Sequence, residues 1–321
     1  MAGFYLALTD RVGRNWQTRH FSSPAEGGAG PPSPCYDPAL RRSEPKIRNS
    51  KSRIGRHRPK LGQHFLHDQQ YRTRILEELP LLAGDVVIEI GPGRGAMTAL
   101  LAARARKVIA IEVDALLAQR LQEDFRGQPV VQIILADVLR IDFGGLCRQE
   151  GIAQAFVFGN LPYYITSPIL QHLFLQRNWI RSMGLLMQRE VAERLTAVPG
   201  TRDYGYLTLA AQLYSHPEIA LSVPPGAFSP APQVHSSLVT FSMKAKFDWW
   251  PQTRYDGFLT FLKRCFAQKR KNLLNNLGGI YLRSRVLAAF EALGKPASVR
   301  AEELSLEELA DLYGRLSHTS G

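Results

Sequence analysis

The chain has 321 residues, of which 45% are hydrophobic and 21% charged, which is the composition of a folded protein of about two domains. It contains no run of about 18 apolar residues, so we expect no membrane span. The three cysteines, Cys35, Cys147 and Cys265, are too far apart for a zinc motif and too few for a disulfide framework, so we expect a cytoplasmic protein.

The charge is unevenly distributed along the chain. Residues 1–60 hold twelve Lys or Arg against four Asp or Glu, which is +8 of the net +12, so the other 261 residues carry only +4. A basic balance predicts a polyanionic partner, most often nucleic acid. A solvated surface with a basic tail accounts for the composition equally well.

Residues 1–58 differ from the rest of the chain. Residues 22–38 are rich in Gly, Pro and Ser, residues 41–58 form a basic run, and no apolar periodicity persists. We predict a basic, disordered extension that can hold RNA phosphates. Because its composition is rich in Arg and poor in acids, an organellar address also stays open.

From residue 59 onward, apolar runs alternate with segments of helical periodicity. The predicted elements are a helix at 69–79, a strand at 86–90, a helix at 96–105, a strand at 107–112, a helix at 114–125, strands at 130–135 and 155–158, a helix at 168–175, a strand at 181–187, a helix at 189–195, and further elements at 206–214, 218–223 and 237–243. This alternation predicts an α/β domain over 59–245, with a parallel sheet covered by helices on both faces.

The pattern changes near residue 246. Helical periodicity continues to the end of the chain, over 255–268, 269–277, 284–293 and 305–316. In the last segment, leucines at 306, 309, 312 and 316 repeat at helical spacing. We therefore predict a small all-α domain over 246–321.

The strand at 86–90 leads into a glycine-rich turn, residues 91–95, and then into a helix. Glycines allow a nucleotide to approach the backbone closely, and a helix N-terminus offers free N–H groups. Gly91, Gly93 and Ala96 also satisfy the loose dinucleotide-binding pattern. Alone, the motif fits NAD and S-adenosylmethionine equally, and a tight turn without any ligand remains the structural alternative.

Polar residues end three successive strands. Glu112 ends the second strand, 21 residues after Gly91, where an acid can accept from both ribose hydroxyls of a nucleotide; a solvated acid is the alternative. Asp137 ends the third, where an acid can accept from an adenine amine while the Val138 N–H donates to the ring; an N-cap is the alternative. Asn160 follows the fourth strand. Parallel strands would bring all three residues to one edge of the sheet.

The turn at 159–164, with the sequence Gly-Asn-Leu-Pro-Tyr-Tyr, provides chemistry suited to an aromatic amine. We expect Gly159 and Pro162 to break the preceding strand. The Asn160 amide oxygen and the carbonyl of Leu161 or Pro162 can accept the two hydrogens of an exocyclic amine, and Tyr163 can stack on its ring. Isolated motifs of this kind are usually surface turns. Combined with the polar strand ends, the turn favours a methyltransferase, since an NAD enzyme has no use for it.

Two further features carry open alternatives. Phe228, on the Pro-rich loop at 223–232, could clamp a flipped base opposite Tyr163, or it could be a buried loop anchor. Basic residues at 263, 264 and 269–271 could hold an RNA backbone or could be a solvated helix face. His64, His67, His172 and His235 form no ligand set, so we expect no metal.

As a set, these motifs resemble the ribosomal RNA small-subunit adenine N6,N6-dimethyltransferase family, the bacterial KsgA (RsmA) type. The resemblance covers residues 59–316 and rests on the segments 62–66, 89–93, 159–163, 188–194, 223–236 and 266–277, with Glu112 and Asp137 in the expected order. Residues 1–58 have no counterpart in the family pattern.

The resemblance implies a Rossmann-like, class I S-adenosylmethionine-dependent methyltransferase domain and a helical domain that helps the protein bind small-subunit rRNA. It implies dimethylation of N6 on two adjacent adenines in a hairpin loop near the 3′ end of that RNA, with a role in ribosome biogenesis. The target base would be flipped out and held by Asn160 for direct in-line transfer. His64 stands where many bacterial members have Asn, and we expect cofactor binding to survive. The implied cofactor contacts are His64, Leu66, Gly91, Glu112, Asp137 and Asn160; the implied catalytic residues are Asn160, Leu161, Pro162, Tyr163 and Phe228.

Three other hypotheses remain at this stage. A 23S-type rRNA adenine methyltransferase shares the motifs, although the long loop at 223–236 and the helical domain favour the small-subunit enzyme. A ribosome-assembly factor would need binding more than catalysis. A dehydrogenase would bind nicotinamide. We expect a monomer with small-subunit rRNA or the small subunit as partner and with no membrane partner.

Overall fold

The computed structural model describes residues 63–268 and 271–317. The predicted extension at 1–58 lies outside these ranges, as do Lys269 and Arg270 of the predicted basic cluster. Within the described ranges, no helix is both long enough and apolar enough to cross a membrane.

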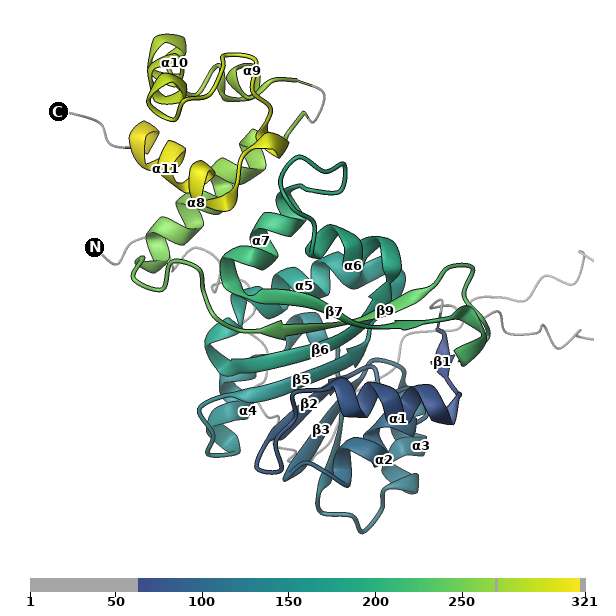
Figure 1. Ribbon diagram of the computed structural model, residues 1–321. Helices are drawn as coiled ribbons and strands as arrows, with labels where there is room; N and C mark the ends of the chain where they lie inside the picture. The colour runs from purple at the N-terminus through teal and green to yellow at the C-terminus, as the bar shows by residue number, and fades with distance from the viewer. Residues whose placement is uncertain (1–62, 269–270, 318–321) are drawn as a thin grey trace, which may run out of the picture. The chain divides into compact units, whose positions relative to one another are not determined.

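A seven-stranded sheet forms the centre of the molecule (Figure 1). Its order is β4-β3-β2-β5-β6-β9-β7. The strands are β2 (Val86–Ile90), β3 (Lys107–Glu112), β4 (Val131–Leu135), β5 (Ala155–Asn160), β6 (Ile180–Gln188), β7 (His216–Val223) and β9 (Ser236–Ser242). The first five in this order pair in parallel, but β9 runs antiparallel to both β6 and β7. The prediction of a parallel sheet is therefore wrong for β9, the last strand along the chain. The chain must reverse direction between β7 and β9 because no crossover helix joins them.

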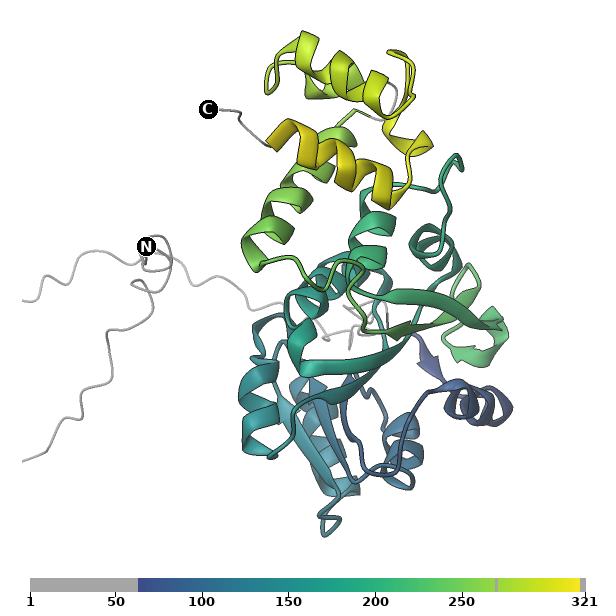
Figure 2. The same cartoon turned by 60° about the vertical axis from the view of Figure 1, so that its left-hand side comes forward.

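Helices cover both faces of the sheet, as Figures 1 and 2 show. They are α1 (Gln69–Glu78), α2 (Ala96–Ala102), α3 (Ala115–Asp124), α4 (Phe143–Gln149), α5 (Thr166–Leu175), α6 (Arg189–Leu195) and α7 (Tyr206–Tyr214). Neighbouring strand residues belong to different cores: Val87 packs with α1 and α2, whereas Ile88 packs with α4 and α5. Because both faces are buried, these strands are largely apolar instead of alternating.

The C-terminal region contains α8 (Gln252–Cys265), α9 (Leu273–Leu277), α10 (Arg283–Ala292) and α11 (Leu306–Ser317). The four leucines predicted at helical spacing in the last segment are all buried. The helix predicted over 269–277 begins only at Leu273, because Asn272 caps it and accepts a hydrogen bond from the Asn275 N–H. One continuous apolar core links these helices to the sheet, and a domain boundary near residue 246 stays a prediction.

Two features near the site differ from the prediction. Gly159 does not end a strand but lies within β5, paired with Ile90 on one side and Leu185 on the other. A Cβ atom on it would lie 3.2 Å from the Ile90 carbonyl oxygen, so the close packing of neighbouring strands explains the glycine. A two-stranded sheet was not predicted: β1 (Phe65–Leu66) pairs antiparallel with β8 (Phe228–Ser229).

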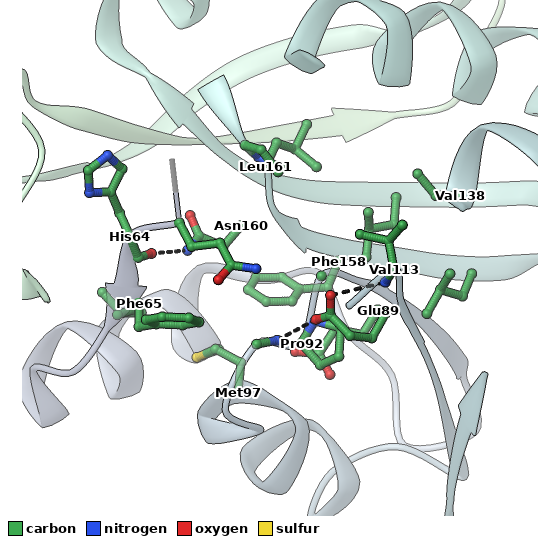
Figure 3. Close-up of a pocket in the computed structure, with 18 of the residues that line it drawn as sticks. His64, Phe65, Glu89, Pro92, Met97, Val113, Val138, Phe158, Asn160 and Leu161 are labelled. Atoms are coloured by element: carbon green, nitrogen blue, oxygen red, sulfur yellow. Dashed lines mark hydrogen bonds between the residues drawn. The ribbon is translucent and has the colours of Figure 1, made fainter. Parts of the chain in front are cut away.

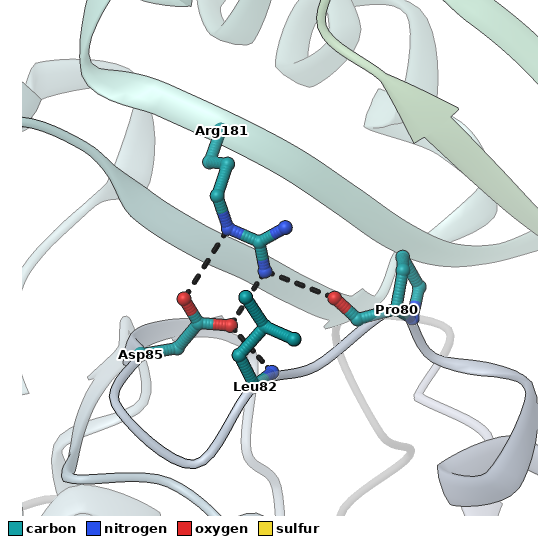
Figure 4. Close-up of polar contacts among 4 residues, drawn as sticks. All are labelled: Pro80, Leu82, Asp85 and Arg181. Carbon is teal, nitrogen blue, oxygen red and sulfur yellow. Dashed lines mark hydrogen bonds and ion pairs between the residues drawn. The ribbon is translucent and has the colours of Figure 1, made fainter.

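An ion pair fixes the loop before β2 against the sheet (Figure 4). Arg181 on β6 donates from Nη2 to Asp85 Oδ2 at 2.5 Å and from Nε to Oδ1 at 3.2 Å. Its Nη2 also donates to the Pro80 carbonyl, while Asp85 accepts from the Leu82 N–H. The end of α1 and the start of β2 are thus held to a strand about 100 residues away in the sequence.

Candidate functional site

A cavity of about 500 Å³ opens at the carboxyl ends of the parallel strands (Figure 3). This edge is where open α/β sheets bind ligands. The structure brings together at this cavity every residue that was predicted to contact a cofactor. The predicted turn after β5 lines the same cavity. The predicted residues that line the cavity are His64, Leu66, Gly91, Glu112, Asp137, Asn160, Leu161, Pro162 and Tyr163.

The glycine turn forms one wall of the cavity. Gly91 and Gly93 have φ angles of +68° and +59°, which other residues rarely adopt. A Cβ on Gly93 would lie 2.9 Å from the Phe65 ring, which packs directly over the turn. The Arg94 guanidinium in turn lies over that ring, 4.7 Å from its centroid. The turn therefore needs glycine both for its conformation and for the approach of Phe65.

Glu112 is 3% exposed and held in one orientation by backbone groups. Its Oε2 accepts from the Gly93 N–H at 3.1 Å, and its Oε1 accepts from the N–H groups of Val113 and Asp114 at 3.0 Å. Burial raises the pKa of Glu112, and the three hydrogen bonds oppose that shift. A carboxylate with about four acceptor positions keeps about one for a ligand hydroxyl.

Asp137 takes the structural role of the two that the sequence left open, and the contact with an adenine stays a prediction. Its Oδ1 caps the short helix at Val138–Arg140 by accepting from the Leu139 N–H at 3.0 Å, which is the predicted structural alternative. Its Oδ2 lies 4.0 Å from Arg140 Nε. Both Asp137 and Val138 nevertheless line the cavity, so capping does not remove them from a ligand.

Asn160 lies at the end of β5, and one hydrogen bond defines its orientation. Its Nδ2 donates to the His64 carbonyl at 2.9 Å, as Figure 3 shows. Since the amide nitrogen is used in this way, the amide oxygen is the end left to accept from a ligand. The Pro162 carbonyl already accepts from the Ile165 N–H and the Thr166 hydroxyl, both at 3.1 Å. Of the two carbonyls suggested by the sequence, that of Leu161 is thus the better second acceptor.

Tyr163 is half-buried beside this turn. Its hydroxyl lies 2.7 Å from Ser236 Oγ on β9, and its ring centroid lies 5.4 Å from that of His64. Burial raises the pKa of Tyr163, so the phenol stays neutral at physiological pH. The ring is therefore held at the cavity by a neutral hydrogen bond at its far end.

Phe228 does not reach the cavity, and its predicted role as a base clamp is wrong. It is 2% exposed and packs in the core with Leu66, Leu186 and Leu238. The physical reason is β8: pairing with β1 turns the Phe228 side chain into the core, which is the loop-anchor alternative.

The sequence analysis missed Glu89, although a charged residue in the apolar strand Val-Val-Ile-Glu-Ile was a signal. Glu89 lines the cavity, is 2% exposed, and its Oε2 has no hydrogen-bond partner among the described residues. Thr98 Oγ1 is likewise buried and unpartnered there. Burial raises the pKa of Glu89 to about 7. Buried polar atoms without partners are costly, so a cationic or hydrogen-bond-donating ligand group fits this end of the cavity.

The predicted basic cluster is described only in part. Lys263, Arg264 and Lys271 are exposed, and Lys263 Nζ lies 5.5 Å from the centroid of the Tyr206 ring. In the part of the chain that the structure describes, no three His, Cys, Asp or Glu residues are grouped so that they could hold a metal ion.

The sequence is similar to one protein family and to named proteins within it. The family model described as "Ribosomal RNA adenine dimethylase" matches residues 54–317. The chain is 46% identical over 260 residues to Ribosomal RNA small subunit methyltransferase A of Acidobacterium capsulatum, covering 80% of this chain and 90% of that protein. It is 41% identical over 263 residues to the protein of the same name from Koribacter versatilis, with coverages of 79% and 92%.

Two solved structures have similar folds. A dimethyladenosine transferase from Plasmodium falciparum aligns with a TM-score of 0.66 at 22% identity, over 78% of this chain and 96% of that one. The 23S rRNA methyltransferase ErmE aligns with a TM-score of 0.62 at 28% identity, over 79% of this chain and all of that one. The first similarity shows the fold alone.

Proposed function

We propose, from the premise that this chain belongs to the ribosomal RNA adenine dimethylase family, that its cavity binds S-adenosylmethionine and presents it to adenine N6 at Asn160. The chain is an S-adenosylmethionine-dependent rRNA adenine dimethyltransferase of the small ribosomal subunit. The observation that carries our assignment of residues is the orientation of Asn160, whose amide oxygen is left available by the bond from Nδ2 to His64.

The residues that line the cavity fit the chemical groups of this cofactor. Glu112, held by three N–H groups, would accept from a ribose hydroxyl, and Asp137 with the Val138 N–H would contact the adenine. The unpartnered oxygen of Glu89 suits an ammonium group. When bound, S-adenosylmethionine supplies an electrophilic methyl group.

The target amine needs help because its lone pair is delocalised into the adenine ring. Acceptance of its two hydrogens by Asn160 Oδ1 and the Leu161 carbonyl would pull the nitrogen towards a tetrahedral geometry and direct the lone pair. Tyr163, fixed by Ser236, would stack on the ring of the extruded base. Positioning provides most of the rate enhancement, and no strong base is required, because the proton becomes acidic once the nitrogen is alkylated.

The finer details of the reaction follow from the family. We infer that two adjacent adenines of a hairpin loop near the 3′ end of the small-subunit rRNA each receive two methyl groups. The second transfer to each adenine needs space for the first methyl group and proceeds with one fewer hydrogen bond. The exposed basic side chains at 263, 264 and 271 would contact RNA phosphates. A protein with this substrate would act in the cytoplasm, where ribosomal subunits assemble.

The direct test is methyl transfer from labelled S-adenosylmethionine to unmethylated small subunits, followed by mass spectrometry of the digested RNA. We expect two neighbouring N6,N6-dimethyladenosines. Asn160→Ala should lower the rate about 100-fold or more, because it removes a preorganised acceptor at the reacting nitrogen. The dissociation constant of the cofactor should change much less. Absence of transfer to any RNA by the wild-type protein would overturn the proposal.

A second candidate substrate is 23S rRNA, suggested by the likeness to ErmE at 28% identity. The higher identities to small-subunit methyltransferases favour the first candidate. Free large subunits serve as the control substrate, since label in their RNA would favour the second. If Asn160→Ala abolishes transfer but still supports small-subunit maturation in cells, binding matters more than catalysis.

A further inference from the structure

The segment before α1, residues 63–67, lies over the cavity as a strap. Its β1 pairs with β8, and the His67 N–H donates to the Ala227 carbonyl at 3.0 Å. Phe65 packs over the glycine turn and Leu66 is buried in the core. The strap is therefore attached on one side to the loop at 224–235, which joins β7 to β9, and lines the cavity on the other.

His64 forms hydrogen bonds on both sides of this strap, one through its backbone and one through its ring. Its carbonyl accepts from Asn160 Nδ2 at 2.9 Å, and its ring Nδ1 lies 2.8 Å from the Pro230 carbonyl oxygen. A carbonyl only accepts hydrogen bonds, so Nδ1 must carry the hydrogen. One residue thus connects the 224–235 loop, through its side chain, with the Asn160 amide, through its backbone. Figure 3 shows the carbonyl pointing to Asn160 and the ring lying away from it.

We propose that the His64 side chain is a positioning residue, which holds the strap to Pro230 so that its own carbonyl orients the Asn160 amide. This inference rests on the proposed function, because it assigns Asn160 Oδ1 to the target amine. An Asn amide has nearly the same shape after a flip, so only hydrogen bonds fix which end faces the substrate. Without the bond to Pro230, the strap carbonyl is less firmly placed and the amide loses the constraint that directs Oδ1.

The competing assignment is that the ring contacts the cofactor through Nε2. The two assignments use different ring nitrogens, and substitution can separate them. The amide nitrogen of Asn extends about as far from the backbone as His Nδ1, whereas that of Gln extends about as far as His Nε2. His64→Asn can therefore keep the bond to Pro230, His64→Gln can keep a bond made by Nε2, and His64→Ala keeps neither.

Three measurements on the full-length protein test the proposal. They are kcat and KM for small subunits at saturating cofactor, the dissociation constant of the cofactor, and hydrogen exchange of the Asn160 side-chain amide by NMR in the apo protein. We expect His64→Asn to stay within about threefold of wild type in kcat. His64→Ala and His64→Gln should lower kcat about fivefold to tenfold, which corresponds to one lost hydrogen bond. In these two variants the Asn160 amide should also exchange faster.

The opposite pattern would overturn the proposal. If Gln restores function and Asn does not, or if only the cofactor dissociation constant changes, then Nε2 contacts the cofactor. If His64→Ala has the kcat and amide exchange of wild type, the ring has no positioning role. Failure of the proposed function is distinguishable, because the wild-type protein would then transfer no methyl group. The exchange measurement would still test the link from His64 to Asn160, since it needs no substrate.

Discussion

Several polar side chains of the cavity have hydrogen-bonding capacity that the protein itself does not use. Asn160 uses its amide nitrogen, Glu112 uses about three of four acceptor positions, and Glu89 leaves Oε2 without a partner in the described structure. In a core, such atoms destabilise the fold. Here they face one cavity, so a ligand can satisfy them. The arrangement destabilises the apo protein and at the same time provides a preformed binding site.

Because of Glu89, the unfolding free energy of the apo protein should depend on pH. Burial raises its pKa in the folded protein to about 7 from 4.5. At a pH between 4.5 and 7, the Glu89 carboxyl is ionised in the unfolded chain and protonated in the folded protein. Unfolding therefore releases a proton, and stability falls as pH rises. The loss approaches about 3 kcal/mol and is complete above pH 7. Glu89→Gln should remove this dependence and stabilise the apo protein at pH 8, as measured by denaturant unfolding across pH.

Cofactor binding should show the reverse trend. An ammonium group favours the ionised carboxylate, so binding by the wild-type protein should strengthen from pH 5.5 to 7, and the Glu89→Gln protein should bind more weakly with a flatter profile. Isothermal titration at several pH values measures both. Equal pH profiles for the two proteins would mean that Glu89 does not face the charged group of the ligand.

Sequence alone identified most of these residues because their motifs are local. Strand ends and turn residues are fixed by neighbours in the chain, which is why Glu112, Asp137 and Asn160 could be assigned to one edge of a sheet. The burial of Phe228 and the hydrogen bond of His64 to Pro230 depend on the pairing of β1 with β8. That pairing joins segments more than 160 residues apart through two-residue strands, and neither strand has a periodicity to detect.

At the scale of single elements, the glycine turn gives a prediction with a matched control. Gly93 and Gly127 both have positive φ, +59° and +78°, but a Cβ on Gly93 would crowd the Phe65 ring while one on Gly127 would meet nothing within 4 Å. Both Ala variants carry the backbone cost of about 1–2 kcal/mol. Only Gly93→Ala should also displace Phe65 and weaken cofactor binding. Equal cofactor dissociation constants for the two variants would contradict this.

The ion pair of Arg181 with Asp85 predicts an effect on stability and not on chemistry. Asp85 is mostly buried, so Arg181→Ala leaves its carboxylate with the Leu82 N–H but no cation, and it frees the Pro80 carbonyl. We expect unfolding free energy to fall by about 1–3 kcal/mol. Arg181→Ala, Asp85→Ala and the double variant form a thermodynamic cycle. Additive effects of the two single substitutions would mean that the pair is not coupled.

At the scale of the whole molecule, the sheet and the C-terminal helices share one core. Tyr214 of α7 stacks on Tyr255 of α8 with ring centroids 5.5 Å apart, and the Arg177 guanidinium lies over both rings. The change of pattern near residue 246 was visible in the sequence, but this continuity was not. Periodicity marks which face of a helix is buried and does not mark which partner buries it.

A shared core predicts that both parts unfold together. Tyr255 is 3% exposed and its hydroxyl donates to the Phe247 carbonyl at 2.6 Å, so Tyr255→Ala should cost about 3–5 kcal/mol. Tyr255→Phe keeps the ring, and it should cost only the hydrogen bond, about 1 kcal/mol. Tryptophan fluorescence reports on four side chains, among them Trp250 where the C-terminal helices meet the sheet, and far-UV circular dichroism reports on the whole chain. We expect the two signals to change at one denaturant concentration in wild type and in both variants. If the Tyr255→Ala protein instead shows two separate transitions, the helices form an independent domain, and the core at the join contributes little to cooperativity.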